Sequence, residues 1–188
     1  PALHPVGHRH GRDAKAQRQF AEFAAAWQNQ SPAAANLAMH AAGDIKINYS
    51  CIREPIRANY ETQSQDGKIL APLLGQQSAS DGGVTVVRIL STWIIACADH
   101  VVIVRLTPLD AHVTEMDVTW LVRNSAVEAI DYDAQRLAWL WRANVERALK
   151  LATDHQLGVN SRHYRPGPFA PDEQMLDEWV TWYLSRFV

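Results

Sequence analysis

The spacing of apolar residues changes its period twice along the chain, and each change marks a different kind of element. Near the start, apolar side chains from Phe20 to Trp27 recur at intervals of three and four residues. This period predicts an amphipathic helix over about 14–28, because such spacing places apolar groups on one helical face. Together with the alanine-rich stretch that follows it, the helix forms a predicted helical lead-in over 1–41.

Apolar and polar residues then alternate, which is typical of strands rather than helices. Asp81-Gly82-Gly83 provides a turn, and further short polar segments separate the runs that follow it. Several strands joined by short turns favour an antiparallel sheet, which we expect over 43–123. The predicted strands are 84–90, 92–97, 101–106 and 113–122, after an earlier extended segment that begins at Ile45.

The helical period returns over 133–157, where we expect a long helix with Asp133 as its N-cap and Gly158 ending it. One face of this helix is apolar or small and is predicted to point inward. That face consists of Leu137, Trp141, Asn144, Ala148, Leu151 and His155. A terminal helix is expected over 171–187, with a core stripe that includes Leu176 and Tyr183.

These elements predict a single α+β domain over 1–188 with a helix-grip (START/Bet v1-like) arrangement, in which an antiparallel sheet wraps around the long C-terminal helix. Such an arrangement leaves a cavity between sheet and helix that suits a small organic ligand. We therefore predict that Trp141, Asn144, Ala148 and Leu151 line a substrate pocket.

Composition narrows the function classes. With 188 residues, 47% of them hydrophobic, and a formal net charge of -2, the chain is globular and offers no electrostatic case for nucleic acid or an anionic membrane. No apolar run approaches the roughly 20 residues that span a bilayer. The N-terminus does not read as a signal peptide. We expect a cytoplasmic protein in which Cys51 and Cys97 are buried thiols.

Histidines and tryptophans are the other candidates for chemistry. Three histidines, His4, His8 and His10, lie near the N-terminus, where we expect either a metal site or a flexible or interface segment. His100 and His112 are interpreted as surface or turn histidines. Four tryptophans on the two C-terminal helices could form an aromatic cage for a quaternary ammonium group, although core or interface positions are the plainer interpretation. They are Trp139, Trp141, Trp179 and Trp182.

Several segments in order resemble the catalytic domain of Rieske-type non-haem iron oxygenases, over roughly 49–188. They include Asp131-Tyr132-Asp133, Leu140-Trp141, Gly158-Val159, Pro166-Gly167-Pro168 and Trp182-Tyr183-Leu184 in the last third, and the stretches 60–68, 71–75, 99–102 and 106–109 before it. Within this family the chain most resembles the branch of glycine betaine and other quaternary-amine oxygenases.

The resemblance implies an Fe(II) site of two histidines and one carboxylate. It assigns His4 as the second histidine and places the first just before residue 1. The carboxylate is expected seven residues after Trp141, where the chain has Ala148, whose methyl group cannot bind iron. The Fe(II) ligand set of this chain is thus expected to be incomplete.

A Rieske 2Fe–2S cluster is not expected on this chain. It needs one C-x-H and one C-x-x-H pair. Cys97 and His100 have the second spacing, but Cys51 is followed by Ile52 and Arg53, so the first pair is missing.

Two functional hypotheses remain open. In the first, the chain is the catalytic portion of an oxygenase that hydroxylates or N-demethylates a small organic substrate. In the second, it is a non-catalytic partner subunit or a small-ligand-binding protein. For both, the resemblance implies a trimer-like ring, with a Rieske-cluster-bearing chain and its reductase as partners.

Overall fold

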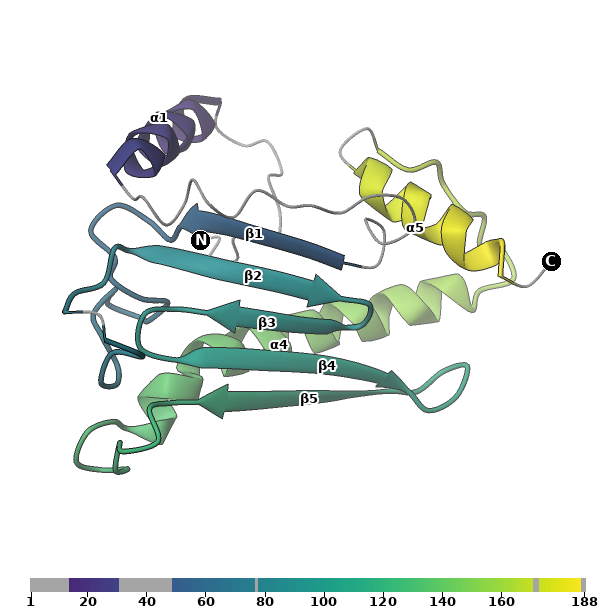
Figure 1. Ribbon diagram of the computed structural model, residues 1–188. Coiled ribbons are helices and arrows are strands. Elements are labelled where there is room, and N and C mark those ends of the chain that lie inside the picture. Colours follow the sequence, from purple (N-terminus) through teal and green to yellow (C-terminus); the bar gives the residue numbers. More distant parts are fainter. Residues whose placement is uncertain (1–13, 31–48, 77, 171–172, 187–188) are drawn as a thin grey trace.

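The computed structural model describes residues 14–30, 49–76, 78–170 and 173–186, and it has an antiparallel sheet with helices around it (Figure 1). The helices are α1 (Ala14–Gln30), α4 (Ala134–Val159) and α5 (Gln174–Leu184). The strands are β1 (Tyr49–Pro55), β2 (Gly83–Ile89), β3 (Thr92–Ala96), β4 (Val101–Pro108) and β5 (Thr114–Leu121).

The five strands form one sheet in the order β1-β2-β3-β4-β5, and every neighbouring pair is antiparallel. Four of the strands match the predicted runs to within two residues. The long helix α4 crosses behind this sheet (Figure 1). The predicted α+β class with a helix-grip arrangement is confirmed. Residues 43–48 of the predicted sheet lie outside the described residues, and residues 56–76 and 78–82 form loops between β1 and β2.

Helix α1 is anchored to the β1 edge of the sheet by Trp27, whose side chain is buried. Its indole Nε1 donates to the carbonyl of Asp81 at 2.6 Å, and the guanidinium of Arg53 lies 5.7 Å from its ring centroid. Arg53 also forms an ion pair with the Asp81 carboxylate at 2.7 Å. Gly83 makes room for this contact, since a Cβ there would lie 2.6 Å from the Trp27 ring.

Helix α4 begins as the sequence predicts, with the Asp133 side chain accepting from the backbone N–H of Arg136 at 2.8 Å. It ends later than expected, since it continues through Gly158 to Val159 with Asn160 as its C-cap. Among the described residues, no helix combines the length and apolar character that a membrane span requires.

The prediction that a whole face of α4 is buried is wrong. Its fully buried residues all lie in the first two turns, and they are Leu137, Ala138, Leu140 and Trp141. A helix of 26 residues is about 39 Å long, whereas an eight-residue strand such as β4 spans only about 26 Å. The helix therefore continues beyond the strand ends (Figure 1).

The predicted core stripe of the terminal helix is also wrong in part. Leu176 and Tyr183 of α5 are 48% and 44% exposed. The Tyr183 ring instead stacks on Trp179, with centroids 5.1 Å apart. The described part of this chain thus does not cover these two apolar side chains of α5.

Candidate functional site

The inner face of the sheet meets α4 in one apolar cluster. The alternation of each strand places one cross-strand row on this face, because β residues two apart share a side. The row runs through Ile52, Val86, Ile95, Val102 and Trp120, one residue from each strand. Trp141 of α4 packs into the same cluster. Of the four residues predicted to line a pocket, Trp141 is the one that the structure places at this interface.

Trp120 adds a polar group to this apolar interface. Its indole Nε1 is buried and has no hydrogen-bond partner among the described residues. A buried donor without a partner is costly in a folded protein, so such a group is available to an oxygen acceptor that enters the interface.

The other three predicted pocket residues are increasingly exposed along α4. Asn144 is half-buried, whereas Ala148 is exposed and Leu151 is 70% exposed. The inward orientation predicted for Ala148 and Leu151 is wrong, because the sheet does not reach that part of the helix. Their assignment to a substrate pocket stays a prediction. His4 lies outside the described residues.

A buried polar cluster, which no sequence pattern announced, lies at the turn between β3 and β4. Asp99 and His100 are 0% and 2% exposed, so His100 lies at a turn, as one of its two interpretations has it, but is not on the surface. Oδ1 of Asp99 accepts from His100 Nδ1 at 2.8 Å and from the Thr62 hydroxyl, and Oδ2 accepts from the Leu70 amide at 2.7 Å. The cluster therefore ties the turn to the loop at 62–70.

The charge of Asp99 is maintained despite its burial. Burial opposes ionisation most strongly, but the hydrogen bonds from His100, Thr62 and Leu70 and the attraction of His100 outweigh it, so the pKa of Asp99 is lowered. A carboxylate whose four lone-pair sites receive three donors in this way acts as a structural anchor rather than as an acid catalyst.

Both cysteines are buried and unbridged, as predicted. Burial raises the pKa of the Cys97 thiol to about 11. Cys97 therefore stays protonated at neutral pH, and a protonated buried thiol is neither a nucleophile nor a ready metal ligand.

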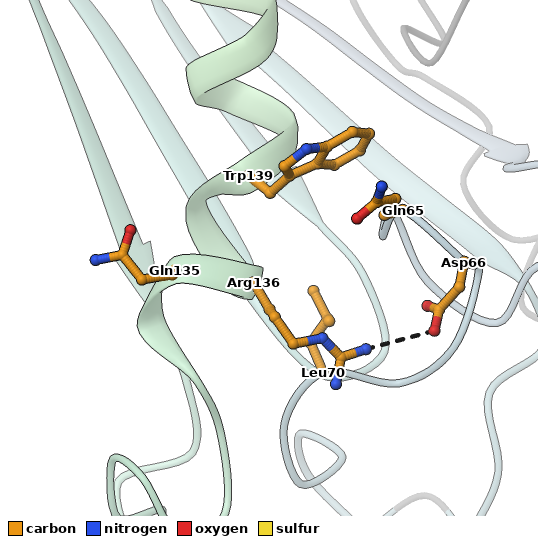
Figure 2. A pocket seen from close by; sticks show the side chains of 6 residues that line it. All are labelled: Gln65, Asp66, Leu70, Gln135, Arg136 and Trp139. Carbon is orange, nitrogen blue, oxygen red and sulfur yellow. Dashed lines mark hydrogen bonds and ion pairs between the residues drawn. The ribbon is translucent and has the colours of Figure 1, made fainter.

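A separate pocket opens between the loop after β1 and the first two turns of α4, with a volume of about 350 Å³ (Figure 2). Asp66 and Arg136 lie across from each other and form an ion pair at 3.4 Å. Leu70 is buried and is drawn behind Arg136, while the Trp139 ring and Gln65 lie above the ion pair in this view (Figure 2). Gln135 completes the lining and points away from the others. The sequence did not reveal this pocket, because its two halves are about 70 positions apart.

An iron site needs several His, Cys, Asp or Glu side chains that converge on one point. The described residues contain no group of three or more His, Cys, Asp or Glu side chains placed to hold a metal ion. Helix α4 offers Ala148, the neutral amide of Asn144 and an exposed His155 on the expected face. The described residues therefore do not fit a non-haem iron site, and no step through iron is derived from them.

Comparisons with known proteins give a consistent result. The family model for the ring hydroxylating alpha subunit, catalytic domain, matches residues 57–187. The glycine betaine monooxygenase oxygenase subunit of Pseudomonas aeruginosa strain UCBPP-PA14 is 27% identical over 173 residues, which cover 90% of this chain and 39% of that protein. The subunit of the same name from Chromohalobacter salexigens is 29% identical over 134 residues, or 70% of this chain and 30% of that protein. The chain thus spans about a third of the length of these curated relatives.

Proposed function

The chain belongs to the family of ring-hydroxylating, Rieske-type oxygenase alpha subunits, as a catalytic domain, and on this basis we propose that it serves in the O₂-dependent hydroxylation or N-demethylation of a small organic substrate. The single observation that carries the proposal is the family match over residues 57–187. The sheet and helix that enclose an apolar interface at Trp141 are consistent with it.

The substrate class proposed is a small quaternary amine that carries a carboxylate. The names of the relatives support this class, since they act on glycine betaine. The chemistry of the interface is compatible with it: the rings of Trp120 and Trp141 lie in the same cluster, and indole rings attract quaternary ammonium groups. The buried N–H of Trp120 is a donor for a carboxylate oxygen.

Partners are part of the proposal. Insertion of one oxygen atom of O₂ into a C–H bond releases the other as water and consumes two electrons and two protons. We assign the electron supply to a Rieske-cluster-bearing chain and its reductase within a trimer-like ring, as the family resemblance implies, and we place this complex in the cytoplasm on the composition of the chain.

The role within such a complex follows from the donor set. Ala148 stands where the family's carboxylate ligand is expected, and the described residues do not gather a three-ligand site. We therefore assign iron binding to a complete oxygenase chain, beside which this chain acts as a partner that encloses or positions substrate. Ala148 is the observation that favours this second candidate, a non-catalytic partner subunit or small-ligand binder.

Iron loading separates the two roles. Anaerobic incubation with Fe(II), followed by metal analysis, is expected to leave well below one iron per chain. Ala148→Asp alone should not raise the iron content, because position 148 is exposed and the described residues gather no group of His, Cys, Asp or Glu that could hold a metal ion. Ala152→Asp, one turn further along α4, is the matched control. One tightly bound iron in the wild type, or in Ala148→Asp but not in Ala152→Asp, contradicts the partner role and supports a catalytic chain.

The oxygenase assignment itself is tested by activity. The chain should co-purify from its native host with a protein that carries a Rieske cluster, and the mixture should consume O₂ and release formaldehyde from glycine betaine. Recovery of homo-oligomers alone, with no such partner and no formaldehyde, would contradict it.

A further inference from the structure

The pocket between the loop after β1 and the start of α4 has a chemistry that the proposed function does not use. Its lining combines one anion (Asp66), one cation (Arg136), an aromatic ring (Trp139) and two amides over a buried Leu70 (Figure 2). None of these side chains belongs to the apolar cluster around Trp141. A volume of about 350 Å³ lies at the lower end of the range typical for small-molecule sites.

The two charges of the pocket are available to a ligand. Arg136 and Asp66 meet through one contact of 3.4 Å, and their side chains are 60% and 48% exposed. Such a long, solvated ion pair contributes little to stability. A ligand can therefore replace either side chain as the partner of the other at small cost. The backbone amide of Lys68 and then the Ser64 hydroxyl lower the pKa of Asp66, so its carboxylate stays ionised at neutral pH.

The loop that carries Asp66 is held in place. Oδ1 of Asp66 accepts from the Lys68 amide at 3.1 Å, and the Ser64 hydroxyl donates to the Lys68 carbonyl at 2.8 Å. Gly67 has a positive φ of 78° and lies so close to Tyr60 that a Cβ would be 2.7 Å from its ring. This constraint keeps the anion in position before any ligand arrives, which reduces the entropy cost of binding.

Trp139 supplies the third feature. Its indole is half-buried and extends from α4 toward Gln65 on the loop (Figure 2). A cationic group is attracted to the face of an indole ring, and more strongly when an anion lies on its other side. The ring and Asp66 line the same pocket, so a cation bound there has both an aromatic face and an anion nearby.

We propose that this pocket binds a small zwitterion, with its carboxylate on Arg136 and its ammonium or quaternary ammonium group between Asp66 and the Trp139 ring. A simple anion is repelled by Asp66 and a simple cation by Arg136, so the pair of charges selects a ligand that carries both. The inference does not rest on the proposed oxygenase function, because it uses neither iron nor the interface at Trp141.

The test uses three probes on the whole chain: glycine betaine, which carries both charges, and acetate and tetramethylammonium, which carry one charge each. Binding is followed by calorimetry and by NMR shifts of the Trp139 indole. Glycine betaine should bind with millimolar affinity, and Arg136→Gln should weaken it by about tenfold or more, since a charge-assisted hydrogen bond is lost. Trp139→Leu should weaken it as well. Arg147→Gln, an equivalent substitution at an exposed site further along α4, should leave affinity unchanged.

Removing either charge should weaken the binding of glycine betaine and strengthen the binding of one simple ion. Asp66→Asn should weaken glycine betaine but strengthen acetate, because the repulsive carboxylate is gone while Arg136 remains. Arg136→Gln should strengthen tetramethylammonium in the same way. Thermal unfolding of each variant checks that the fold is kept. If Trp139→Leu does not fold, Asp66→Asn takes its place as the test of the cation contact.

Three outcomes would overturn the proposal. They are the absence of glycine betaine binding at high millimolar concentration, equal affinities for betaine and acetate, and betaine affinity that is unchanged in both Arg136→Gln and Trp139→Leu. None of these depends on iron content or O₂ consumption, so failure of the pocket and failure of the oxygenase assignment are distinguished.

Discussion

Replacing Asp99 by asparagine is expected to destabilise the fold far more than the same change at an exposed ion pair. Asp99 is fully buried and accepts from Thr62, from His100 and from the Leu70 amide. Asparagine has one acceptor oxygen in place of two. With this oxygen toward Thr62 and His100, the NH₂ group opposes the Leu70 amide, which loses its acceptor; with it toward Leu70, Thr62 and His100 must change from donors to acceptors.

The expected loss can be estimated from these contacts. An unsatisfied buried donor costs about 1–3 kcal/mol, and the remaining bonds lose their charge-assisted strength. We expect a loss of about 2–4 kcal/mol in the free energy of unfolding, a large part of the roughly 5–15 kcal/mol typical of a native protein. The melting temperature should fall by roughly 5–15 °C for a domain of this size.

Asp117→Asn provides the matched control. Like Asp99, Asp117 accepts hydrogen bonds through its carboxylate. Its partner is Arg105 at 2.7 Å, but the side chains of Asp117 and Arg105 are 41% and 62% exposed. Its loss should cost at most about 1 kcal/mol. Urea unfolding followed by tryptophan fluorescence measures both variants. Losses for Asp99→Asn and Asp117→Asn that agree within error would refute the assignment of Asp99 as a buried anchor.

The dependence of stability on pH has a defined sign. The pKa of Asp99 is lowered from its ordinary value of 3.8, so its charged form is favoured in the folded state. Its contribution is therefore present above pH 3.8 and is lost as pH falls through the lower folded value. Asp99→Asn should lack this component, and its unfolding free energy should decline less steeply in acid than that of the wild type.

Three further predictions concern the other contacts of the fold. Asp133→Ala removes the N-cap of α4 and should cost about 1 kcal/mol in urea unfolding. Gly83→Ala should displace Trp27, because its Cβ would meet the ring at 2.6 Å, and should thus change tryptophan fluorescence and lower the melting temperature. Cys97 should resist alkylation in the native protein and react on unfolding, since its thiol is buried with a pKa of about 11, as peptide mass spectrometry can follow.

Each of these has an outcome that contradicts it. Gly158→Ala, where an added Cβ meets nothing within 4 Å, is the control for Gly83→Ala, and equal effects would contradict the steric argument. Unchanged stability in Asp133→Ala would mean that the cap bond is not formed in solution. Alkylation of native Cys97 at the rate of a free thiol would show that the site is open.

The sequence predicts the secondary elements well where local rules govern them. Asp133 caps α4 because a short side chain with an oxygen acceptor suits that position in any context. The strands follow from alternation, and the antiparallel pairing of β2 to β5 follows from short turns. Gly158 misled the prediction of the helix end, since glycine permits a left-handed cap but does not require one.

The sites could not be predicted in the same way. Thr62 and Asp99 are 37 positions apart, and the pairing that buries them depends on the loop path rather than on a local pattern. Helical spacing did place Ala148 and Leu151 on the same side of α4 as Trp141. It could not reveal that the sheet ends before it reaches them, because periodicity carries no information about the length of the opposing layer.

The consecutive order of the strands also determines the order in which the molecule is expected to fold. Strands β2 to β5 are joined in series by short connections, whereas the bonds of Asp99 to Thr62 and Leu70 close loops of 37 and 29 residues. Short loops close first, so the three hairpins should form early and the Asp99 bonds late. Loss of the Asp99 carboxylate should therefore accelerate unfolding while leaving the folding rate nearly unchanged. The polar cluster would then govern how long the native chain persists rather than how fast it is reached.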